Sequence, residues 1–219
     1  MAQFRDLRLP ERQTLYHRDN AGMKLIALDM KKANFQAMRA VNDALVDRSD
    51  CWEEFLGQFT DEPYYLDCKQ LRQVIFGQLN PKRQQTVMKH RMAKVFSALI
   101  DLGVDESQVF SSSPDEIVIG FSPENRDRVC TLLSSDETYK GLHHETFTLA
   151  LAHPTKHFFI KKHEGSGKVD LKGIPKFYVP EVIRHLKDEA PNANDRFFMH
   201  EGRLCQYAEP LYNNETETT

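Results

Sequence analysis

The pattern of apolar and polar positions is most distinctive at residues 108–121, which read QVFSSSPDEIVIGF. Two β-prone runs, at 108–111 and 117–121, enclose a short polar segment that contains a proline and the acidic pair Asp115 and Glu116. Short polar residues and proline between apolar runs are typical of a tight hairpin. The pattern therefore predicts a hairpin with two carboxylates at its turn or at the start of its second strand.

A further strand is predicted upstream, at residues 23–30 (MKLIALDM). Its apolar run at 25–28 is unbroken, as expected of a central strand that is covered on both faces. The strand ends in a single acid, Asp29. Residues 14–17 are expected to form a short partner strand that is joined to it by a turn at 19–22.

Apolar side chains recur at three- and four-residue spacings in several other segments, which predicts helices. The longest helix is expected to begin at Asn80 and Pro81, a capping residue followed by proline, and to end at Gly103. The other predicted helices span residues 31–47, 50–59, 66–79, 122–133 and 180–186. Strands are predicted at 146–151 and 158–162, a loop at 165–173, and a terminal hairpin at 196–200 and 204–208. This order predicts an α+β fold in which helices pack on one face of an antiparallel sheet.

Composition narrows the class of protein. With 219 residues, 40% hydrophobic and 28% charged, the chain resembles an ordinary soluble domain. Its four cysteines are scattered without a CxxC spacing, which favours reduced thiols and an intracellular, cytoplasmic location. No apolar run approaches the ~20 residues that span a bilayer, so no membrane partner is expected. The net charge of -3 argues against a uniformly positive surface but allows a local basic groove.

The acids at the strand ends suggest a chemistry. Transfer of a nucleotide requires in-line attack on phosphorus, which two Mg²⁺ ions about 3.5–4 Å apart can promote. Mg²⁺ prefers oxygen ligands, usually one or two carboxylates together with phosphates and waters. If their strands are neighbours, Asp29 and Asp115 could bind such ions, with Glu116 assisting.

A strand that ends in an acid, followed later in the chain by a hairpin with two acids, resembles the palm domain of template-dependent nucleic-acid polymerases. The similar families are the reverse-transcriptase-like and family B polymerases. Residues 28–35 (LDMKKANF) are similar to the first palm motif, and residues 113–120 (SPDEIVIG) to the third. The chain departs from the family in having Glu116 as its second acid and Ser113-Pro114 in place of an aromatic residue. Residues 158–175 bear a weaker similarity to lysine-bearing strands of family B polymerases.

The resemblance implies a palm-like (ferredoxin- or RRM-like) sheet and a nucleotidyltransferase that uses Mg²⁺ or Mn²⁺. A nucleoside triphosphate, DNA or RNA and a larger protein assembly are the implied partners. A palm-like domain would span residues 1–160, with a helical, fingers-like insertion at about 48–103. A β/α extension would follow at 161–212, and a disordered tail at 213–219.

Several basic residues are candidates for binding phosphate. Lys69 and Arg72 lie one helical turn apart, and guanidinium groups suit phosphate oxygens. The predicted phosphate-binding residues are Lys69, Arg72, Lys82, Arg83, Lys161 and Lys172. The alternative is a solvated basic face. Phe35 is a candidate for contact with the nucleotide sugar, although it also fits the apolar stripe of its helix.

Two other functions stay open. The departures from the palm motifs favour a catalytically inactive palm-like protein, or an unrelated α+β binding or structural subunit. An acid pair in a hairpin also resembles diguanylate cyclases, although the two glycines that usually precede the acids are missing here. The sequence contains neither a P-loop nor a dinucleotide-binding GxGxxG. A histidine-rich region is interpreted as surface rather than a zinc site, and comprises His143, His144, His153, His157 and His163.

Overall fold

The structure is a computed structural model that describes residues 8–10, 14–77, 79–136, 139–190, 192–206 and 211–212. The chain divides into two compact units, one formed by residues 1–15 and 25–146 and the other by residues 16–24 and 147–219. The predicted domain limits at 160 and 212 stay predictions, and the predicted tail at 213–219 lies outside the described residues. None of the described helices is both long and apolar enough to cross a membrane.

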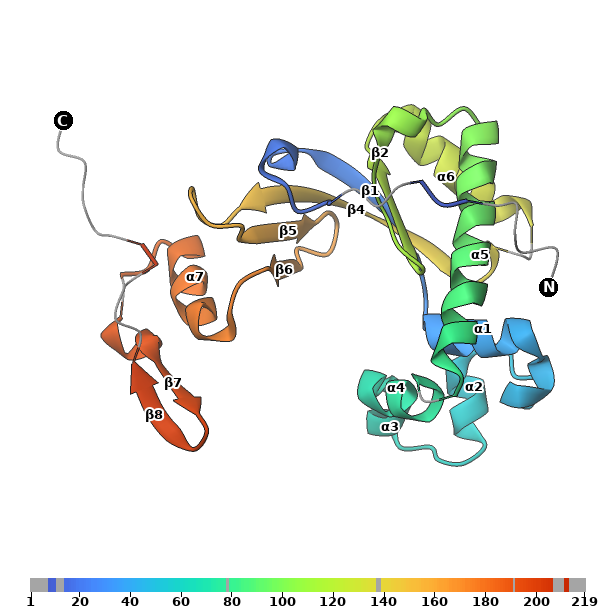
Figure 1. Cartoon of the computed structure of the whole chain (residues 1–219), viewed down its shortest axis with the longest axis horizontal. Helices are drawn as coiled ribbons and strands as arrows, with labels where there is room; N and C mark the ends of the chain where they lie inside the picture. Colours follow the sequence, from blue (N-terminus) through green and yellow to red (C-terminus); the bar gives the residue numbers. More distant parts are fainter. Residues whose placement is uncertain are drawn as a thin grey trace. The chain divides into compact units, whose positions relative to one another are not determined.

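The fold is α+β, as predicted, and its strands form a six-stranded antiparallel sheet in the order β2-β3-β1-β4-β5-β6 (Figure 1). The strands span β1 (Lys24–Met30), β2 (Val109–Ser112), β3 (Glu116–Gly120), β4 (Leu142–Leu151), β5 (Phe159–His163) and β6 (Val169–Lys172). The predicted hairpin is present as β2 and β3, and the predicted central strand as β1.

The core of the first unit lies between the sheet and two helices, α5 (Pro81–Asp101) and α6 (Pro123–Ser135). Alternate residues of β1 enter this core, namely Ile26, Leu28 and Met30, and Ile117 and Ile119 of β3 join them. Both helices begin as the sequence predicted, because Asn80 and Ser122 cap the backbone N–H groups of Arg83 and Asn125.

A second core in the same unit is built from helices alone (Figure 1). Its helices are α1 (Ala33–Val41), α2 (Trp52–Gly57), α3 (Pro63–Asp67) and α4 (Lys69–Gly77), with a 3-10 turn at Asp43–Val46. Fully buried aromatic rings dominate it, and Phe76 makes edge contacts with both Phe35 and Trp52. The indole Nε1 of Trp52 donates to the Leu66 carbonyl at 2.8 Å, which satisfies its one buried donor.

The second unit contains β5, β6, helix α7 (Val179–Leu186) and a separate hairpin of β7 (Phe197–His200) and β8 (Arg203–Gln206). Its core includes Phe158, Tyr178 and Val182. The buried carboxylate of Glu181 accepts hydrogen bonds from the backbone N–H groups of Leu211 and Tyr212, at 2.7 and 3.0 Å. This interaction ties the end of the described chain to α7.

Four local predictions were wrong. Residues 14–17 form no strand, and β1 pairs with β3 and β4 instead. The predicted helix at 31–47 ends at Val41, because Asn42 is extended, and the helix at 66–79 is divided at Cys68 for the same reason. The predicted loop at 165–173 contains β6, since Val169–Lys172 completes a ladder with β5 that apolar periodicity does not reveal.

Candidate functional site

The acid predicted at the end of β1 stands beside an acid of β3. In the antiparallel register of these strands, Asp29 lies directly opposite Glu116. Residues in directly opposite positions project from the same face, with Cβ atoms roughly 4.5–5.5 Å apart. The two carboxylates are therefore close neighbours on adjacent strands.

Side chains alternate between the two faces of a sheet along each strand, and this alternation determines the face that carries the two carboxylates. Leu28 and Met30 enter the core beneath α5 and α6, so Asp29 projects from the opposite face. The same holds for Glu116, because its neighbour Ile117 belongs to that core. The Asp29 side chain keeps 38% of its surface accessible, so ligands can reach the carboxylate.

Asp115 lies at the turn of the hairpin, one of the two positions that the sequence predicted for the acid pair. It lies in the bend before β3, and its carbonyl accepts a hydrogen bond from the Met30 N–H at 2.8 Å. Its Oδ1 accepts from the Ser113 hydroxyl at 2.8 Å, and the same hydroxyl accepts from the Glu116 N–H at 2.9 Å. We expected Asp29 to act together with Asp115 and Glu116 to assist, whereas the register places Glu116 opposite Asp29.

A third polar side chain reaches Asp29 from its other side, because β4 neighbours β1 in the sheet. Nε2 of His143 lies 3.8 Å from Oδ2 of Asp29, and its Nδ1 lies 3.1 Å from the Asp29 carbonyl oxygen. Glu116, Asp29 and His143 thus form a row across three strands, which we call the acid–histidine row. The sequence pattern indicated only a surface histidine at His143, because the predicted strand began after it, at residue 146.

Whether this row suits a metal ion depends on its donor set. Among the described residues, no three His, Cys, Asp or Glu side chains are arranged as a complete metal site. Mg²⁺ and Mn²⁺ need no such set, since one or two carboxylates suffice when phosphate oxygens and waters supply the rest. Asp29 and Glu116 provide that minimum, and Asp115 adds a nearby exposed carboxylate.

Two partly buried cations lie in the same unit. Lys32 follows β1, has a left-handed backbone (φ 54°), and forms an ion pair with Glu53. Burial lowers the pKa of Lys32, and the nearby Arg72 guanidinium lowers it further. Burial also lowers the pKa of Arg72, whose guanidinium lies 5.9 Å from the centre of the Trp52 ring. We call Lys32 and Arg72 the cation pair. The sequence analysis singled out Arg72 but missed Lys32, which only the fold brings near it.

No family model, curated protein or solved structure matches this chain. The function must therefore be inferred from its own residues.

The other predicted phosphate-binding residues are dispersed. Lys69 is exposed at the start of α4, and Lys82 and Arg83 are exposed in the first turn of α5. Within the described part of the chain, no ion pair or side-chain hydrogen bond joins any of these three to the acid–histidine row. Their role as phosphate ligands stays a prediction.

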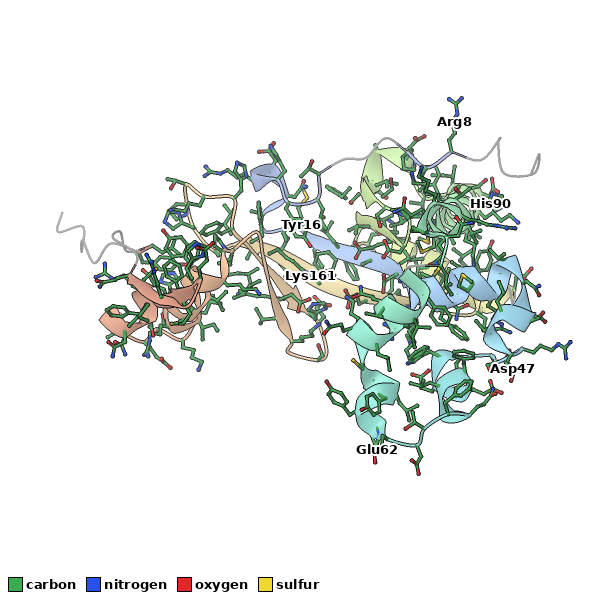
Figure 2. All side chains as sticks on the ribbon, turned by 60° about the horizontal axis from the view of Figure 1, so that its bottom comes forward. Arg8, Tyr16, Asp47, Glu62, His90 and Lys161 are labelled. Atoms are coloured by element: carbon green, nitrogen blue, oxygen red, sulfur yellow. The ribbon has the colours of Figure 1, made fainter. Side chains whose placement is uncertain are left out.

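Lys161 and Lys172 belong to the second unit. Lys161 of β5, which is labelled in Figure 2, is only 6% exposed. Its Nζ lies 4.2 Å from the centre of the Phe147 ring, a cation–π contact. Lys172 pairs with Phe159 at the end of β6 and is partly exposed. Of the two, Lys172 has the more accessible side chain.

Phe35 had two predicted roles, contact with the nucleotide sugar or a place in the helix core, and the structure places it in the core. Its side chain is completely buried and lies against Phe55 and Phe76, with ring centres 6.2 and 6.0 Å away. No part of the ring is accessible to a ligand, so the prediction of sugar contact does not describe this structure. The position of Phe35 in the apolar stripe of its helix agrees with this burial.

Proposed function

We propose that this chain is a palm-type nucleotidyltransferase that acts on a nucleoside triphosphate and a DNA or RNA strand. The order of its elements supports a palm-like assignment. The chain runs from β1 through helices to β2 and β3, then through α6 to β4, and the strands are ordered β2-β3-β1-β4. A split βαβ arrangement of this kind is the ferredoxin-like pattern. The helices between β1 and β2 would correspond to a fingers-like insertion.

The observation that carries the proposal is the pairing of Asp29 with Glu116 on the adjacent strands β1 and β3. Like charges directly opposite each other are unfavourable, and a bound cation would offset their repulsion. Asp29 and Glu116 would hold Mg²⁺ or Mn²⁺, with Asp115 as a further oxygen donor. When bound, these ions would activate the attacking oxygen and stabilise the leaving one.

The protein's own side chains would provide charge and position. His143 fixes one side of Asp29 through contacts with both its carboxylate and its carbonyl. The cation pair supplies positive charge on partly buried side chains, which would attract an anion such as a triphosphate. Arg72 would bind phosphate oxygens, and Lys32 would exchange its ion pair with Glu53 for a phosphate.

A second candidate is a palm-like subunit that binds nucleotide or nucleic acid without catalysis. One observation favours it, because the carboxylate of Asp115 is engaged by the Ser113 hydroxyl. A cyclase-like activity is a third candidate, because it would use the same acids on a nucleoside triphosphate alone.

Incubation of the protein with labelled NTPs or dNTPs and Mn²⁺ or Mg²⁺, with and without primer-template, separates these candidates. Primer extension supports the proposal, a cyclic product from the nucleotide alone supports the cyclase, and nucleotide binding without product supports the inactive subunit. Asp29→Asn and Glu116→Gln are expected to abolish extension. Glu106→Gln, a change at an exposed acid outside the row, is the matched control.

A further inference from the structure

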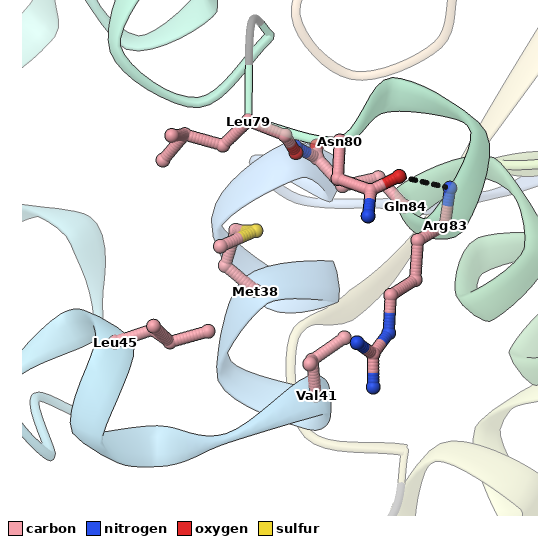
Figure 3. Close-up of a pocket in the computed structure, with 7 residues that line it drawn as sticks. All are labelled: Met38, Val41, Leu45, Leu79, Asn80, Arg83 and Gln84. Carbon is pink, nitrogen blue, oxygen red and sulfur yellow. Dashed lines mark hydrogen bonds between the residues drawn. The ribbon is translucent and has the colours of Figure 1, made fainter.

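A small apolar pocket opens on the helical part of the first unit (Figure 3). Its volume is about 180 Å³. The residues that line it are Met38, Val41, Leu45, Leu79, Asn80, Arg83 and Gln84. This volume is below the ~300–1,000 Å³ of typical small-molecule sites, so the pocket suits a single large side chain rather than a cofactor.

The pocket has a firm floor. Gln84 is buried, and its amide donates to the carbonyls of Phe76 and Leu79, which links the end of α4 to the start of α5. Asn80 adopts a left-handed backbone (φ 50°), and its Oδ1 accepts from the Arg83 N–H at 3.3 Å (Figure 3). The hollow is therefore preformed by the backbone connection between the two helices.

Its rim is apolar and accessible. Leu45 and Leu79 are 49% and 47% exposed, which is high for leucine beside a cavity. Exposed apolar surface around a hollow is typical of a site that a partner covers. Met38 at the wall is flexible and can adapt to side chains of different shape.

Charge decides the kind of partner. Arg83 is the only charged residue that lines the pocket among the described residues, and Lys82 precedes it. The first turn of α5 contains no acid, and the helix N-terminus adds further positive potential. Within the described chain, no ion pair or side-chain hydrogen bond engages the Arg83 guanidinium, which can therefore form a bidentate pair with a carboxylate.

We propose that this pocket docks a partner protein through a segment in which a large apolar side chain is flanked by Asp or Glu. The apolar side chain enters between Val41 and Leu45, and an adjacent carboxylate pairs with Arg83. Such a site uses a central apolar anchor with a charged rim, as protein interfaces commonly do. The proposal does not rest on nucleotidyl transfer, because the pocket and the acid–histidine row have no residue in common.

The test measures fluorescence polarisation of three labelled peptides. One has a Leu-Phe anchor between Asp and Glu, the second replaces these acids by Lys, and the third replaces the anchor by Ala-Ala. We expect the acidic, anchored peptide to bind at least about tenfold more tightly than either control, as loss of one charge-assisted pair or one anchor implies. Equal binding of the acidic and basic peptides overturns the proposal.

Variants locate the site. Arg83→Glu is expected to lower the affinity for the acidic peptide at least about tenfold and to raise the affinity for the basic peptide. Leu45→Ser should lower the affinity for both peptides that carry the Leu-Phe anchor. Lys94→Glu, a charge reversal at an exposed position farther along α5, should leave both affinities unchanged. Circular dichroism melting verifies that each variant is folded. Unchanged binding by both Arg83→Glu and Leu45→Ser overturns the assignment.

Two further outcomes distinguish other occupants. If ATP displaces the peptide, Arg83 belongs to a nucleotide site and the docking proposal fails. Sedimentation in the analytical ultracentrifuge shows whether the protein is a dimer. If Arg83→Glu and Leu45→Ser both dissociate such a dimer, a second copy of the chain occupies the pocket and the proposal of a separate partner also fails. Peptide binding to a monomer that ATP does not disturb supports it.

Discussion

Asp29 and Glu116 occupy directly opposite positions on β1 and β3, although the described chain between them includes the five α-helices α1 to α5 and the strand β2. Two acids placed side by side on adjacent strands of a sheet repel each other. Under the proposed function, a cation bound by the two carboxylates would offset this repulsion.

Mg²⁺ or Mn²⁺ should stabilise the wild-type protein. Binding to the folded state alone raises the free energy of unfolding by about 2.7 kcal/mol when the metal is at 100 times its Kd. Asp29→Asn and Glu116→Gln should lose this rise, while Glu106→Gln should keep it. Thermal unfolding with and without metal measures the effect, and an equal rise in all four proteins would assign metal binding to another site.

Arg72 should matter more than Lys69 for nucleotide affinity. A hydrogen bond to a charged group contributes about 1.5–3 kcal/mol, so Arg72→Ala should weaken binding roughly 10- to 100-fold. Lys69 is solvated at the surface, and Lys69→Ala should change affinity by less than about threefold. Isothermal titration with a nucleoside triphosphate decides this, and a larger loss in Lys69→Ala would move the phosphate site to the exposed face of α4.

Phe35 should act as a core residue. Phe35→Ala should lower the free energy of unfolding by about 3–5 kcal/mol, because it leaves a cavity beside Phe55 and Phe76. Phe35→Leu should be milder, below about 1.5 kcal/mol if the core repacks. Urea unfolding followed by Trp52 fluorescence provides the measurement. A fully stable Phe35→Ala with weakened nucleotide binding would restore the sugar-contact hypothesis.

Asn80 combines two local roles that substitution can separate. Asn80→Ala should destabilise the protein by roughly 1–3 kcal/mol, since alanine neither caps α5 nor tolerates a left-handed backbone. Asn80→Gly should cost only a few tenths of a kcal/mol, because glycine adopts this backbone freely and is an acceptable cap. Thermal unfolding of the pair tests this. Equal losses would mean that the side chain matters for packing rather than for the backbone.

Asp170 should make stability depend on pH. Burial opposes its ionisation, but hydrogen bonds from His163 and Lys168 outweigh burial and hold the pKa of Asp170 below its ordinary value. A carboxyl whose pKa is lowered by folding adds stability above its unfolded pKa of about 3.9, and loses it as the pH falls through the folded value.

Asp170→Asn should therefore reduce stability at pH 7 by about 1 kcal/mol, and the difference from wild type should shrink towards pH 3. Urea midpoints across this range provide the measurement, with Asp101→Asn at an exposed helical position as the control. A loss of stability in Asp170→Asn that stays constant with pH would show that Asp170 stabilises the fold through packing rather than through its charge.

The sequence by itself determined much of the local structure. The capped starts of α5 and α6, the apolar strand β1 and the hairpin of β2 and β3 are all encoded by neighbouring residues, so they could be predicted without knowledge of the fold. The α+β class followed from their order. Short-range signals failed where tertiary contacts override propensity, as in the strand β6 and the division of the helices at Asn42 and Cys68.

Only the tertiary structure decided which side chains meet. Strand register placed Glu116 rather than Asp115 opposite Asp29, because β3 begins at Glu116 and Asp115 lies in the bend before it. The approach of His143 to Asp29, and of Arg72 to Lys32, likewise depends on segments far apart in the chain. Local periodicity carries no information about such contacts, which are fixed by how the sheet and helices bury their apolar faces together.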